Sequence, residues 1–121
     1  MGLDQWAYKR KSIKTSKDKN SKPQKVQEAL LMEWRKHANL EGWMANLYYE
    51  KGGMETFNCI DLPLTAGDLK ELSSVHKILE EAKGFFWGES TPEDIEKTAK
   101  FIDLALKAIQ DGYEIIYRSW W

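Results

Sequence analysis

The chain has 121 residues, 42% of them hydrophobic and 31% charged, a composition typical of one globular domain and unlike that of a disordered or fibrous protein. Its formal net charge of −1 conceals two oppositely charged parts, because residues 1–25 hold eight Lys or Arg against two Asp, a net +6 that leaves −7 for the remainder. A single cysteine excludes an intrachain disulfide, and with two histidines a Cys/His zinc site would lack ligands.

The first predicted element is a strand over residues 3–11, where alternation places Trp6, Tyr8 and Arg10 on one face. Residues 12–22 follow as a flexible, lysine-rich loop with too few apolar residues to offset the entropy of ordering. Pro23 then opens a predicted helix, with an inward stripe spaced by three and four residues: Val26, Ala29, Leu30, Trp34 and His37.

The middle of the chain predicts two more helices around a short strand. Asn39 is a plausible N-cap for a helix that ends at Gly52 and Gly53. Residues 55–64, which contain Cys59 as a small buried residue, favour a strand. Thr65 with Asp68 resembles a capping box, and it predicts a helix over residues 65–82.

The last part carries the clearest local signals. Thr91 as N-cap, Pro92 at the first helical position and Gly112 beyond the end predict a helix of close to 20 residues. Residues 113–121 alternate and predict a final strand. The fold class is therefore α+β: one domain over residues 1–121, with a small, mostly antiparallel sheet of about three strands and four helices packed mainly on one face.

The sequence lacks the motifs of common enzymes. It has no phosphate-binding glycine loop, no dinucleotide fingerprint, no zinc-protease motif and no nucleophile elbow. We expect no metal and no cofactor. His37 and His76 are the residues suited to proton transfer near neutral pH, and each fits a structural role as well. We therefore favour a non-enzymatic protein, with a hydrolase or transferase that uses His37 as general base as the alternative.

Aromatic residues suggest a binding surface instead. Phe86 and Trp87 lie in a glycine-bounded stretch that suits either a ligand platform or the core. Trp120 and Trp121 are adjacent in a predicted strand, so they point to opposite faces and one of them needs a partner. We expect an aromatic recess with polar contacts, and its candidate ligand-binding residues are Arg35, His37, Trp43, Asn58, Phe86, Trp87, Arg118 and Trp120.

Several short segments, in this order and spacing, resemble a family of small proteins from tailed bacteriophages: residues 1–5, 34–37, 40–44, 57–58, 84–86 and 119–121. The family often carries the label phosphoglycerate kinase. A kinase of that kind closes two lobes over nucleotide and sugar phosphate, whereas this chain has room for one lobe and lacks a phosphate-cradling loop. The resemblance implies no activity, cofactor or catalytic residue. The chain departs from the family pattern at residues 12–22 and at Trp87.

Three kinds of partner remain open. The first is a host protein or a small anionic or nucleotide-like molecule held in the aromatic recess. The second is nucleic acid at the lysine-rich segment, which has no aromatic residues for stacking on bases. The third is a second copy of the chain, in an oligomer formed through the terminal tryptophans, with a homodimer as the commonest arrangement. No apolar run could cross a bilayer, and the first residues lack the order of a secretory signal, so we expect a cytoplasmic protein without membrane contact, in the host cytoplasm if the gene belongs to a phage.

Overall fold

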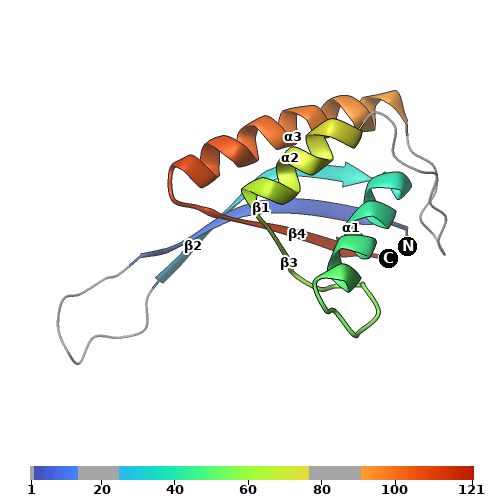
Figure 1. Cartoon of the computed structure of the whole chain (residues 1–121), viewed down its shortest axis with the longest axis horizontal. Coiled ribbons are helices and arrows are strands. Elements are labelled where there is room, and N and C mark those ends of the chain that lie inside the picture. Colours follow the sequence, from blue (N-terminus) through green and yellow to red (C-terminus); the bar gives the residue numbers. More distant parts are fainter. Residues whose placement is uncertain (1, 14–24, 77–90) are drawn as a thin grey trace.

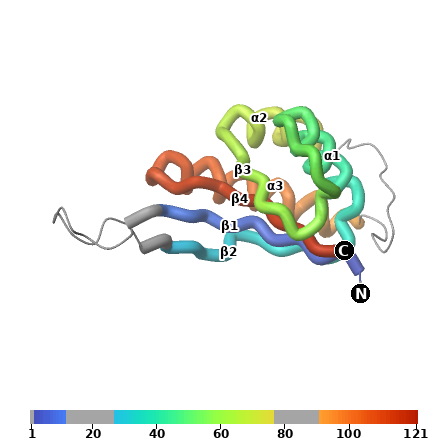
Figure 2. Tube along the Cα trace, turned by 90° about the horizontal axis from the view of Figure 1, so that it is seen from below, coloured from blue at the N-terminus to red at the C-terminus, as the bar shows by residue number. Residues whose placement is uncertain are grey.

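The computed structural model describes residues 2–13, 25–76 and 91–121. Their elements are β1 (Asp4–Ile13), β2 (Lys25–Arg35), α1 (Ala38–Glu50), β3 (Leu62–Leu64), α2 (Ala66–Val75), α3 (Pro92–Gln110) and β4 (Glu114–Trp120). The strands form one antiparallel sheet in the order β2-β1-β4-β3. The described helices lie on one side of this sheet, and none of them covers β1 and β2 on the other (Figure 1, Figure 2). The α+β class is confirmed.

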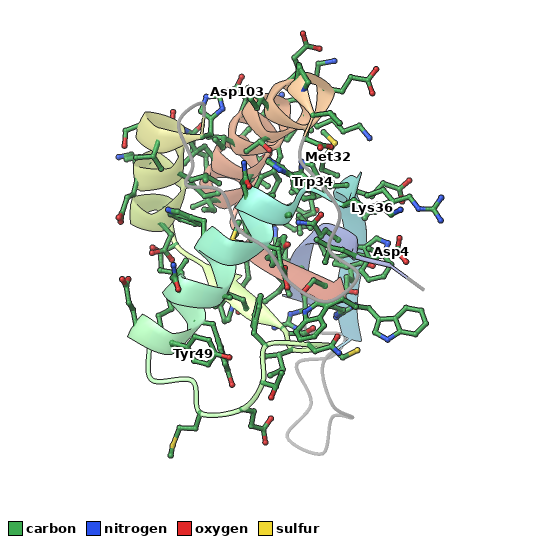
Figure 3. The ribbon with its side chains drawn as sticks, turned by 90° about the vertical axis from the view of Figure 1, so that its right-hand side faces the viewer. Asp4, Met32, Trp34, Lys36, Tyr49 and Asp103 are labelled. Carbon is green, nitrogen blue, oxygen red and sulfur yellow. The ribbon has the colours of Figure 1, made fainter. Side chains whose placement is uncertain are left out.

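The segment predicted as the first helix is strand β2, so the described chain has four strands and three helices rather than three and four. The cause is a bulge. Ala7 pairs with Met32 but Tyr8 pairs with Leu30, so β2 carries one extra residue. The inward positions Ala29, Met32 and Trp34 are therefore spaced by three and then two residues, and the predicted helical stripe combined Ala29 and Trp34 with Leu30, which lies on the other face of the strand. Met32 and Trp34 project from β2 toward α3 (Figure 3).

The other helices begin close to where the sequence predicts. Thr65 with Asp68 and Thr91 with Asp94 both form complete capping boxes, in which each side chain accepts a hydrogen bond from the backbone N–H of the other. The N-cap position of α1 is occupied by His37 rather than by Asn39, and no side-chain capping hydrogen bond is formed there. The predicted continuation of α2 to residue 82, and residues 14–22 of the predicted loop, lie outside the described residues; residues 12–13 belong to β1.

The predicted strand over residues 55–64 is shorter than expected, since only Leu62–Leu64 pairs with β4. A turn precedes it, in which the Asn58 N–H donates to the Thr56 carbonyl at 2.8 Å. Cys59 follows with a positive φ of 59° and is exposed, so the prediction of a buried strand position is wrong. A left-handed conformation does not fit a regular strand.

The core lies between the sheet and the helices. Trp34, at 2% exposure, packs edge-on against Phe101 of α3 with ring centroids 5.2 Å apart. Its indole N–H donates to the Thr98 hydroxyl at 3.1 Å. Tyr117 of β4 joins the same cluster, with its ring 6.2 Å from that of Phe57. These contacts fix α3 across β2, β1 and β4.

Gly53 gives a first test of this packing. A Cβ at Gly53 would overlap the ring of Tyr48, which is itself held against Tyr49 and Phe57. We expect Gly53→Ala to lower the free energy of unfolding by about 1–3 kcal/mol, as measured by urea denaturation. Gly67→Ala is the matched control. Its Cβ meets nothing closer than 3.6 Å, and alanine in helix α2 should stabilise the fold by about 0.5–1 kcal/mol. Equal effects of the two substitutions would contradict the packing described here.

Candidate functional site

The side of the sheet opposite the helices, which we call the outer face, carries a group of exposed apolar side chains. Residues opposite one another in the register share a face of the sheet. Tyr8 is thus flanked by Leu30 of β2 and Ile116 of β4. Trp120 stands opposite Asp4, diagonally beside Trp6. We call this group, which crosses three strands, the apolar row: Trp6, Tyr8, Leu30 and Trp120.

The apolar row is open to solvent. Trp120 is 56% exposed and Leu30 is 51% exposed, while Trp6 and Tyr8 are half-buried. Large apolar side chains exposed together on a sheet are unusual unless another molecule covers them. Alternation in the sequence places Trp6 and Tyr8 on one face of β1, but it does not bring Leu30 beside them, because the pattern of β2 predicts a helix.

Ion pairs lie beside and across the apolar row. The Arg118 side chain donates from Nε and Nη2 to the two oxygens of Asp61, at 2.5 and 3.0 Å, and its Nη1 lies 3.7 Å from Glu28. Arg10 pairs with Glu114 at 3.2 Å. The Arg118 guanidinium also lies 4.8 Å from the centre of the Tyr8 ring. The arginines are therefore held in place before any partner binds.

The electrostatics of the outer face are acidic overall. The hydrogen bonds from Arg118 hold the pKa of Asp61 below its usual range, and Asp61 in turn raises the pKa of Arg118. In the described residues of this face, five carboxylates stand against three guanidinium groups, a net charge of −2: Asp4, Glu28, Glu33, Asp61 and Glu114, against Arg10, Arg35 and Arg118. This balance disfavours a phosphate or nucleotide as the ligand.

A shallow depression adjoins the outer face, where the paired ends of β1 and β2 meet α3. Its volume is about 180 Å³, and it is lined by Asp4, Trp6, Glu33, Trp34, Arg35 and Lys97. Sites for small molecules usually enclose about 300–1,000 Å³. The depression is therefore of a size for one inserted side chain rather than for a nucleotide.

The structure brings only some of the predicted site residues together. Arg118 and Trp120 lie on the outer face, and Arg35 lies there too, 3.7 Å from Asp4. Three others lie elsewhere. His37 is buried before α1, Trp43 packs against the core, and Asn58 exchanges two hydrogen bonds with the backbone of Trp121, at 2.8 and 3.0 Å. Phe86 and Trp87 lie outside the described residues.

A second polar cluster lies inside the molecule, at the start of α1. Gln5 accepts from the His37 backbone N–H at 2.8 Å and donates to the His37 carbonyl at 3.0 Å. Glu41 accepts from the Tyr117 hydroxyl at 2.7 Å and from the Ser119 hydroxyl at 2.9 Å. The cluster links β1, β4 and α1 through buried hydrogen bonds, which specify how α1 sits on the sheet.

Burial shifts Glu41 and His37 toward their neutral forms. It raises the pKa of Glu41 to about 7 and lowers the pKa of His37 to about 4. A general base must reach the proton that it abstracts. Glu41 is 0% exposed and His37 is 1% exposed, so a substrate has no direct access to either side chain. The geometry favours a structural role for both.

Comparisons with known proteins add no assignment, because no family model, curated protein or solved structure matches this chain. In the ranges that the structure describes, no group of three or more His, Cys, Asp or Glu side chains is placed to hold a metal ion. None of the helices within those ranges is long and apolar enough to cross a membrane.

Proposed function

We propose that this chain is a non-enzymatic binding protein whose outer face engages another protein. One observation carries the proposal: on the side of the sheet that the described helices leave open, exposed Trp120 and Leu30 stand with half-buried Trp6 and Tyr8 among preformed ion pairs. Protein interfaces concentrate their binding energy in this way, with central Trp, Tyr and Arg residues surrounded by polar groups that exclude water.

The charge of the outer face indicates the chemistry of the partner. A net charge of −2 favours a surface with an apolar patch bordered by lysines or arginines. It opposes a symmetric pairing of two outer faces, which would bring two acidic surfaces together. The outer face therefore fits a different protein better than it fits a second copy of this chain. The resemblance to bacteriophage proteins suggests that the partner is a protein of the bacterial host, in its cytoplasm.

The proposal is tested by a quantitative pull-down from bacterial lysate with matched variants. We expect at least one protein to be lost with Trp120→Ala and retained with Tyr49→Ala. Tyr49 is 48% exposed but lies on α1, far from Asp4 (Figure 3). Truncating a central anchor costs about 2 kcal/mol or more, so the purified partner should bind Trp120→Ala about 30-fold more weakly by calorimetry. If every captured protein is retained equally by Trp120→Ala and Tyr49→Ala, the proposal is wrong.

A further inference from the structure

A short segment between α1 and β3, residues 57–61, contacts the end of β4, and we call it the brace segment. Its Cys59 backbone N–H donates to the Ser119 carbonyl at 2.8 Å. Its Asn58 side chain donates to the Trp121 carbonyl at 2.8 Å and accepts from the Trp121 N–H at 3.0 Å. These three hydrogen bonds lie beyond the last regular pair of β3 with β4, so they extend the support of β4 to its end.

The brace segment is itself fixed to the core and to the outer face. Phe57 is 2% exposed, and its ring lies 6.2 Å from the ring of Tyr117. The Phe57 carbonyl accepts from the indole N–H of Trp121 at 2.9 Å. At the other end of the segment, the Asp61 carboxylate accepts from the Arg118 side chain. The segment therefore connects the end of β4 to the core and to the ion pairs beside the apolar row.

Trp120 lies between the two residues of β4 that the brace segment holds by their backbone. On the other edge of β4, Trp120 pairs with Asp4 of β1. Ser119 is 1% exposed, whereas the side chain of Trp120 lies on the outer face. The end of a strand frays when few contacts hold it. The hydrogen bonds of Asn58 thus act on Trp120 through the backbone of the next residue.

We propose that Asn58 is a positioning residue for the outer face: its two hydrogen bonds to Trp121 hold Trp120 in the arrangement that binds the partner protein. The inference rests on the function proposed above and adds to it a residue outside the apolar row. A side chain that is already held in its bound arrangement loses less conformational freedom when the partner binds. Without Asn58, Trp120 occupies additional arrangements, and the affinity falls in proportion to the fraction that stays competent to bind.

The first test is NMR relaxation of the Trp120 backbone amide, which requires no partner. We expect an order parameter of about 0.85 in the wild type and below about 0.6 in Asn58→Ala, the values of rigid and flexible backbone. Asn58→Asp keeps the shape of the side chain, but an ionised carboxylate cannot donate to the Trp121 carbonyl. It should therefore lower the order parameter too, whereas a role in packing alone would leave it like the wild type. Asn46→Ala, at an exposed position on α1, is the matched control and should change nothing at Trp120.

The second test uses the protein that the pull-down loses with Trp120→Ala. If Asn58→Ala leaves about a tenth of the molecules competent, calorimetry should show this protein binding about 10-fold more weakly, with unchanged stoichiometry. Thr65→Ala is the control for a general loss of stability. It removes the cap of α2, beyond the opposite end of β3, and should bind as the wild type does.

Three results would overturn the inference: an unchanged order parameter in Asn58→Ala, an Asn58→Asp variant equal to the wild type in both tests, or wild-type affinity of Asn58→Ala for that protein. The third result would leave protein binding at the outer face intact. If instead no protein is lost with Trp120→Ala, the proposed function fails, and the relaxation measurement still decides whether Asn58 holds Trp120.

Discussion

Truncation of Trp34 to alanine is expected to lower the free energy of unfolding by about 3–5 kcal/mol, the usual loss for a large buried aromatic side chain. Trp34 contacts Phe101 edge-on and bonds to Thr98, so the substitution removes packing and leaves the Thr98 hydroxyl without that donor. Domains of this size are stable by only about 5–15 kcal/mol. The measurement is urea denaturation followed by circular dichroism.

Trp120→Ala is the matched control for this experiment. It removes the same side chain from the opposite face of the sheet, where 56% of the residue is already exposed. We expect a change within about 0.5 kcal/mol. Trp34→Phe, which keeps much of the ring volume, should lie between the two. A loss for Trp120→Ala that equals the loss for Trp34→Ala would mean that the outer face is covered by this chain itself.

Glu41→Gln is expected to change how stability depends on pH. In the native state, burial raises the pKa of Glu41 from 4.5 to about 7, so its contribution is fully present below pH 4.5 and is lost as the pH rises through 7. Burial lowers the pKa of His37 from 6.5 to about 4, so its contribution is present above pH 6.5 and is lost as the pH falls through 4. Between pH 4.5 and 6.5 the two effects oppose each other.

The wild type should therefore show a nearly flat stability between pH 4.5 and 6.5. Glutamine cannot ionise and still offers a hydrogen-bond acceptor to Tyr117, so the variant should retain the fold and keep only the His37 effect. Its free energy of unfolding should rise by about 1–3 kcal/mol from pH 4.5 to 6.5. Toward about pH 8 the wild type should lose stability and the variant should not.

Urea denaturation at each pH gives the measurement. Glu33→Gln is the control, because Glu33 is exposed on the outer face. It should reproduce the flat profile of the wild type. If Glu41→Gln is as flat as the wild type, then Glu41 is ionised throughout this range in the native state.

Local signals predicted most of the fold. The caps of α2 and α3 were readable because Thr65 and Thr91 are each followed by an aspartate three residues later. The strands β1 and β4 were readable from alternation. The strand β2 was not, because a single extra residue in the middle of a strand shifts every later side chain to the other parity. Only the pairing with β1, a long-range interaction, reveals that shift.

The candidate site was less predictable for the same reason. Trp120 and Arg118 were singled out from the last strand, and both lie on the outer face. The sequence grouped them with His37 and Trp43, whose aromatic character suits a binding surface and a core equally well. Whether an aromatic ring lies in the core or on a binding surface depends on which face of the sheet the helices cover. Neighbouring residues in the sequence do not determine which face is covered. Leu30 and Asp61 join the face only through strand pairing and an ion pair.

The bulge in β2 also affects whether two copies of this molecule can associate by strand pairing. Within the described chain β2 is an edge strand of the sheet, 11 residues long. The backbone N–H and C=O groups on its open edge could pair with an extended segment of another molecule. The irregularity at Leu31 interrupts that row and increases the local twist. A straight strand from another molecule could therefore not pair with β2 along its whole length. Because continuous strand pairing is what builds a fibril, the bulge at Leu31 works against fibril formation.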